Sequence, residues 1–128
     1  MKVLNIEDSP FKHYDVSKVV LSCTKAEIDW STNLRDGLEK IQYALDQWQP
    51  YDLIITDMFY PLKPGQRDEE AGKILIQNVM DQGLTTPIIL CSTVKYDFPE
   101  ILGCIHYSDL ADWESDLKKL VEKAITQK

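Results

Sequence analysis

The chain alternates five times between a short strand-like run and a longer segment with helix signals. The runs are residues 2–7, 26–30, 52–57, 87–92 and 103–107. Short runs rich in β-branched residues are typical of buried strands. Strands that alternate with helices along one chain form a parallel sheet with helices on both faces. The alternation therefore predicts an α/β fold, with one domain over residues 1–128.

The segments between the runs differ in how strongly they predict a helix. Ser9-Pro10 provides an N-cap followed by proline at the first helical position, for a helix to about Cys23. The second helix is capped by Ser31, Thr32 or Asn33, and its apolar face consists of Leu34, Leu38, Ile41, Leu45 and Trp48. The last helix has an apolar face that consists of Trp113, Leu117, Leu120, Val121 and Ala124. A third helix ends near Gln82, before Gly83. Residues 94–102 leave room for little more than one helical turn, so a fourth helix is short or irregular.

Charge and hydropathy exclude several classes of protein. The net charge of −7 argues against direct nucleic-acid binding, which needs a basic face. No apolar run approaches the roughly 20 residues that span a bilayer, and Met1 leads directly into a strand rather than a signal peptide. The three cysteines lack metal-ligand or redox spacing. These features predict a cytoplasmic protein that does not enter a membrane.

Acidic residues stand at the ends of two predicted strands. Glu7 and Asp8 follow the first apolar run, and Asp57 closes the third. The carboxyl ends of parallel strands meet at one edge of an open α/β sheet, where such folds bind their ligands. If the two strands are neighbours, three carboxylates repel one another unless a cation neutralises them. The pattern therefore favours a weak Mg²⁺ site.

Taken in order, these residues resemble the receiver domains of response regulators, the CheY-like superfamily. The resemblance rests on the pair Glu7-Asp8, on Asp57 with Pro61 four residues later, and on Ser92 after the apolar run that follows Pro87. It covers essentially the whole chain. It implies a flavodoxin-like (βα)5 three-layer sandwich with a five-stranded parallel sheet of order 2-1-3-4-5.

The resemblance also implies a function. Asp57 would accept a phosphoryl group from a histidine kinase or phosphotransfer protein, and Ser92 would donate its hydroxyl to that group. Asp8 and Asp57 would bind Mg²⁺ directly, with Glu7 acting through water and Phe59 giving its backbone carbonyl. Such a domain signals by binding a downstream protein, as a monomer or weak homodimer. It is not an enzyme beyond its own phosphorylation and dephosphorylation.

Three departures from the receiver pattern stand out. Receiver domains carry a lysine after the last strand, where this chain has Tyr107, or His106 if the register slips by one. Lys95 is an alternative source of the missing ammonium. The segment 94–102 is short, and the polar loop 63–70 is extended, so that it could cover the site, bring Lys63 or Arg67 to a phosphate, or bind a partner.

The sequence leaves three functions open. The first is a stand-alone, atypical receiver that signals through phosphorylation of Asp57. The second is a degenerate pseudo-receiver that acts as a protein-interaction module without phosphorylation. The third, an aspartate-nucleophile phosphatase, ranks lowest because such enzymes need a second acid two residues after the nucleophile, where this chain has Phe59.

Overall fold

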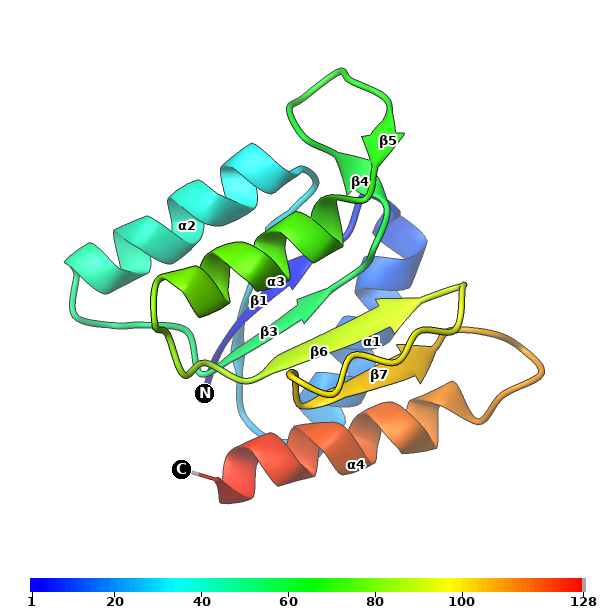
Figure 1. The fold of residues 1–128 in the computed structure, drawn as a ribbon. Helices are drawn as coiled ribbons and strands as arrows, with labels where there is room; N and C mark the ends of the chain where they lie inside the picture. The colour runs from blue at the N-terminus through cyan, green and yellow to red at the C-terminus, as the bar shows by residue number, and fades with distance from the viewer. Residues whose placement is uncertain (128) are drawn as a thin grey trace.

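The computed structural model describes residues 1–127, which fold around a five-stranded parallel sheet (Figure 1). The strands are β1 (Lys2–Ile6), β2 (Glu27–Ser31), β3 (Leu53–Thr56), β6 (Ile88–Ser92) and β7 (Gly103–His106), in the order β2-β1-β3-β6-β7. Two further short strands, β4 (Tyr60–Pro61) and β5 (Asp68–Glu69), pair with each other outside this sheet. The main sheet therefore has the predicted order 2-1-3-4-5, which confirms the flavodoxin-like fold.

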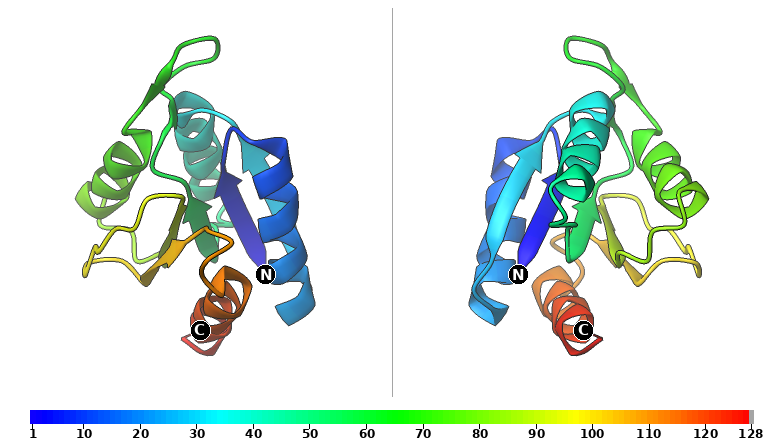
Figure 2. Two further views of the ribbon diagram at one scale, coloured as in Figure 1. Left: turned by 90° about the vertical axis from the view of Figure 1, so that its right-hand side faces the viewer. Right: turned by 90° about the vertical axis from the view of Figure 1, so that its left-hand side faces the viewer.

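Helices cover both faces of the sheet. Helices α2 (Leu34–Asp46) and α3 (Ala71–Asp81) lie on one face, and α1 (Pro10–Cys23) and α4 (Trp113–Thr126) lie on the other (Figures 1 and 2). Successive strand residues alternate between the two cores: Leu53 and Ile55 pack toward α1 and α4, and Ile54 packs toward α2 and α3. Within residues 1–127, each helix is too short or too polar to cross a lipid bilayer.

The helix ends follow the local signals, with one exception. Ser9 caps α1 through its hydroxyl, which accepts the Lys12 N–H, and Asn33 caps α2. Gly83 follows α3 with φ at 71°. The prediction for Trp48 was wrong: it lies beyond the end of α2 at φ 58° and is 92% exposed. The helical period that places Trp48 inward does not apply once the helix has ended.

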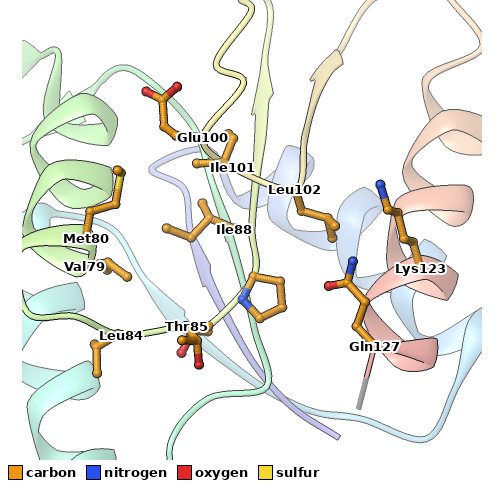
Figure 3. Close-up of a pocket in the computed structure, with 12 residues that line it drawn as sticks. Val79, Met80, Leu84, Thr85, Ile88, Glu100, Ile101, Leu102, Lys123 and Gln127 are labelled. Atoms are coloured by element: carbon orange, nitrogen blue, oxygen red, sulfur yellow. The ribbon is translucent and has the colours of Figure 1, made fainter.

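The connection between β6 and β7 crosses the sheet edge without a helix. Residues 93–102, all within the described part of the chain, form bends and one turn near Pro99. The sheet therefore carries four helices instead of five, the irregular alternative that the sequence left open. A hollow of about 370 Å³ remains beside this connection, where Met80 of α3 and Lys123 of α4 face each other across Ile88 (Figure 3). It lies at the amino-terminal end of β6.

The segment predicted as the loop 63–70 forms the turn and the second strand of a small hairpin. Strands β4 and β5 form its base, and the turn projects beyond the carboxyl edge of the main sheet (Figures 1 and 2). Gly65, at φ 80°, allows the chain to reverse there. The hairpin connects the end of β3 to the start of α3, so its base stands next to Asp57.

Candidate functional site

Three carboxylates meet at the carboxyl edge of the sheet. Strands β1 and β3 pair directly, with Ile6 opposite Thr56, so the residues that follow them are neighbours. Each of Glu7, Asp8 and Asp57 offers an oxygen, and these oxygens lie within 4.8 Å of one another. Glu7 is buried, Asp57 is half-buried and Asp8 is exposed. The sheet topology thus brings together the three acidic residues named from the sequence.

A buried lysine stands among these carboxylates. The ammonium of Lys12 lies 2.9 Å from Glu7 Oε1 and 3.3 Å from Asp57 Oδ2. It also donates to the backbone carbonyl of Cys91, at 2.7 Å. Only 7% of the Lys12 side chain is exposed. One cation therefore contacts groups at the ends of β1, β3 and β6.

Two effects oppose a positive charge on the side chain of Lys12. It lies in the first turn of α1, where the helix dipole disfavours a positive charge. Burial also opposes the charge, yet the neighbouring carboxylates, Glu7 foremost, outweigh it, and the pKa of Lys12 is raised. The acidic cluster is what keeps this lysine charged inside the protein.

The aromatic ring of Tyr107 also contacts the Lys12 ammonium. Its ring centroid lies 5.2 Å from Lys12 Nζ, within the range of a cation–π contact. Its hydroxyl does not point at Asp57 but donates to Asp15 Oδ2 of α1, at 2.9 Å. Burial, and then this bond to Asp15, raise the pKa of Tyr107 to about 12. Tyr107 thus borders the site as a neutral ring.

The ammonium of Lys12 does not fully compensate the burial of Glu7. Burial, reinforced by the charge of Asp57, raises the pKa of Glu7 to about 7, although Lys12 acts in the opposite direction. Glu7 also accepts the backbone N–H of Ser9, at 3.1 Å. At neutral pH the cluster is therefore close to the point at which Glu7 gains or loses a proton.

The backbone around Asp57 is fixed on several sides. The Asp57 N–H donates to the Ile6 carbonyl at 3.0 Å, and Asp57 Oδ1 accepts the Met58 N–H at 2.7 Å. Gly72, at the start of α3, donates its N–H to the Met58 carbonyl at 2.9 Å. A Cβ at Gly72 would come within 2.8 Å of the Met58 Cα. Asp57 is thus held in place by β1 and α3.

An open hollow of about 340 Å³ leads from solvent to the carboxylates. Phe59 and Tyr107 border it, and so do Thr93 and Asp68, which the sequence did not single out. Burial, and then its neighbour Asp8, raise the pKa of Asp68. The hairpin therefore adds a further acidic side chain beside Asp8.

Other predicted residues lie elsewhere. Ser92 is buried at the end of β6, and its hydroxyl accepts the Val94 N–H at 3.3 Å rather than bordering the hollow. His106 is the residue opposite Ser92, and its ring contacts the Thr93 carbonyl. Lys95 and Arg67 are both exposed, and neither borders the hollow. Neither of them takes part in an ion pair within residues 1–127.

Lys12 is the residue that sequence reasoning missed, although a signal was present. The buried face of α1 consists of Lys12, Val16, Val19 and Val20. A lysine three to four residues before an apolar stripe of a helix shares its face. The helix also begins directly after the acidic pair, so a lysine in its first turn lies close to that pair along the chain.

The donor set suits a small divalent cation. Carboxylate oxygens are the ligands that Mg²⁺ and similar hard cations prefer, and Mg²⁺ usually takes only one or two of them, together with waters. Asp8 is exposed and Asp57 is reachable through the hollow, whereas Glu7 already pairs with Lys12. Three carboxylates against one ammonium leave negative charge for a divalent cation to neutralise.

Comparisons with known proteins identify the fold. No protein-family model matches the chain, and no curated protein matches its sequence. Similar solved structures include the response regulatory domain of mrkE from Klebsiella pneumoniae, with a TM-score of 0.77 and 21% identity over 99% of this chain and 97% of that one. The phosphorylated cyanobacterial phytochrome response regulator RcpA has a TM-score of 0.74 and 16% identity over 99% and 95%. The Mn²⁺-bound response regulator Rcp1 has a TM-score of 0.70 and 16% identity over 93% and 90%. The chain thus has the CheY-like fold of response-regulator receiver domains.

Proposed function

We propose that this protein is an atypical receiver domain that accepts a phosphoryl group on Asp57 and thereby signals to another protein. The observation that carries the proposal is the position of Asp57, between the exposed carboxylate of Asp8 and the buried ammonium of Lys12, at the base of an open hollow. A nucleophilic carboxylate needs access, a fixed direction and nearby positive charge, and Asp57 has all three.

The chemistry is the transfer of one phosphoryl group from a histidine side chain to the carboxylate of Asp57. A carboxylate oxygen of Asp57 attacks the phosphorus of a phosphohistidine, the P–N bond breaks, and the imidazole nitrogen keeps the electron pair and takes up a proton. The product is an acyl phosphate on Asp57. Charge builds up on the phosphoryl oxygens during the transfer, so cations at the site favour it.

A divalent cation completes the charge balance in this proposal. Asp8 and Asp57 would hold Mg²⁺, with the Phe59 carbonyl as a third protein ligand and Glu7 behind it. Bound Mg²⁺ neutralises the oxygens of the incoming phosphoryl group. The likeness to Mn²⁺-bound Rcp1 supports the binding of a divalent cation. The donor is a histidine kinase or phosphotransfer protein, and the receiver of the signal is a further protein.

Mass spectrometry after incubation with acetyl phosphate tests the proposal. With Mg²⁺ present, the intact protein should gain the mass of one phosphoryl group, and the gain should disappear in Asp57→Asn. Asp29→Asn is the matched control, since Asp29 lies within β2 opposite Leu4 and its carboxylate accepts the Tyr51 hydroxyl. An unmodified wild-type protein, or an Asp57→Asn variant modified to the same extent, would refute the proposal.

The pseudo-receiver remains the second candidate because of one observation. Lys12 already neutralises part of the cluster from within the chain, without a phosphoryl group or a metal. A protein-interaction module needs no more than that. Absence of both the phosphoryl adduct and Mg²⁺ binding would favour this second candidate.

A further inference from the structure

We infer that Lys12, on the first turn of α1, is the ammonium that binds the phosphoryl group on Asp57. The inference rests on the proposed function and assigns the role of the lysine that is absent after β7. It places the phosphate-binding cation on a helix that precedes the acceptor, not on the last strand.

The contacts of Lys12 define this role. Its Nζ is 3.3 Å from Asp57 Oδ2, close enough to reach oxygens bonded to a phosphorus on that carboxylate. Its shorter contacts, with Glu7 Oε1 at 2.9 Å and the Cys91 carbonyl at 2.7 Å, come from the ends of β1 and β6. An ammonium has three N–H donors, so it can exchange one partner for a phosphoryl oxygen and keep the others.

The surroundings of Lys12 keep the ammonium aimed at the acceptor. The Tyr107 ring, directly after β7, lies 5.2 Å from Nζ. The Ser9 cap fixes the start of α1, and with it the backbone of Lys12. A long side chain that is 7% exposed and in contact with four different groups has little freedom left to lose on binding.

No other cation competes for this place in the described chain. Lys95 is exposed and borders neither the hollow nor the carboxylates. His106 turns its ring to the Thr93 carbonyl, and Tyr107 directs its hydroxyl to Asp15. Among the lysines and arginines of residues 1–127, Lys12 is the one that borders the hollow and contacts Asp57.

Lys12 also competes with a metal in the resting protein. It occupies one oxygen of Asp57 and one of Glu7, which lowers the negative charge available to Mg²⁺. Once a phosphoryl group is present, additional oxygens are available and both cations can be accommodated. Loss of Lys12 should therefore strengthen Mg²⁺ binding to the resting protein while weakening phosphoryl binding.

The test compares Lys12→Met with the wild type in two titrations. Mg²⁺ affinity is measured by isothermal calorimetry, and the affinity for beryllofluoride, a phosphoryl mimic that binds carboxylates, is measured at saturating Mg²⁺. We expect beryllofluoride binding and the rate of acetyl phosphate labelling to fall by about tenfold or more, since hydrogen bonds to charged groups are the strong class. Mg²⁺ binding should become tighter. Lys12→Arg, which keeps the charge, should retain part of the labelling.

Lys18→Met and Lys95→Met are the controls. Lys18 lies on the exposed side of the same helix, over Tyr14, and Lys95 lies on the β6–β7 connection. Both should label like the wild type, and a loss in Lys95→Met would overturn the assignment. Equal labelling of wild type and Lys12→Met would overturn it too, while leaving the proposed function intact. Weaker Mg²⁺ binding together with weaker labelling in both Lys12 variants would show a merely structural role. An unlabelled wild type would refute the proposed function itself.

Discussion

The carboxyl edge of the sheet and the β6–β7 connection differ in how firmly their residues are held. At the carboxyl edge, Lys12 ties the ends of β1, β3 and β6 together, and α3 packs against the backbone that follows Asp57. Residues 93–102 connect β6 to β7 without a helix, and Val94, Lys95 and Asp97 are exposed.

The contrast shows where buried charges constrain the fold. Buried charges persist only where partners surround them, so the carboxyl edge tolerates little change. The connection holds few buried groups. A signal that leaves through β6, whose Cys91 carbonyl bonds to Lys12, would therefore enter a segment with no helix to move.

The strongest test of the rigid region is Gly72→Val. The new side chain would meet the backbone of Asp57 and Met58, which cannot move without disturbing the acceptor. Overpacking of this kind typically costs about 1–3 kcal/mol, and a β-branched residue against backbone belongs at the upper end, about 3 kcal/mol. Urea unfolding measures the loss, with the exposed neighbour Lys73→Ala as control. An unchanged unfolding midpoint would mean that α3 does not fix the acceptor.

A second test uses the raised pKa of Glu7. The folded protein keeps this proton up to about pH 7, whereas the unfolded chain releases it near the ordinary value of 4.5. The contribution to stability is therefore complete below pH 4.5 and is lost as pH rises through 7. Relative to Glu7→Gln, which cannot titrate, the wild type should lose up to about 3 kcal/mol across this window.

Unfolding in urea with EDTA at several pH values checks this prediction, since EDTA removes divalent cations from the cluster. Glu39→Gln, an exposed change on α2, controls for the loss of one charge. Parallel pH profiles for wild type and Glu7→Gln would contradict the raised pKa.

The smallest effect should come from the connection. Val94 is 50% exposed, so Val94→Ser removes little buried apolar surface. We expect the free energy of unfolding to change by less than about 0.5 kcal/mol, as is usual for surface positions. Thermal unfolding and acetyl phosphate labelling should both match the wild type. A large loss of stability would show that this segment is held as firmly as the carboxyl edge.

Much of the fold could be predicted from the sequence because its signals are local. The short apolar runs, the Ser9-Pro10 start of α1 and the stop at Gly83 depend on near neighbours along the chain. The parallel order then follows from strand–helix alternation together with the family resemblance. The hairpin was not predicted, because its two-residue strands are too short to give a period.

The site was predictable in its acids but not in its cation. The sequence pattern identifies Glu7, Asp8 and Asp57 because they follow strands that end at one edge of the sheet. Lys12 comes from a helix, and its contact with Asp57 depends on how α1 packs on the sheet. Receiver domains carry their lysine after the last strand, and the sequence there, or just after Ser92, offers only Tyr107, His106 and Lys95 as candidates.

A crystal structure of the protein with Mg²⁺ and beryllofluoride tests most directly whether Asp57 accepts a phosphoryl group that Lys12 binds. We expect beryllofluoride on a carboxylate oxygen of Asp57 and Mg²⁺ on Asp8 and Asp57. A fluorine should lie about 3 Å from Lys12 Nζ, which is the length of a charge-assisted contact. Crystals in which Asp57 carries no beryllofluoride at saturating concentration would contradict the proposed role of Asp57. Fluorines bound by another cation, with Lys12 still on Glu7 and the Cys91 carbonyl, would contradict the proposed role of Lys12.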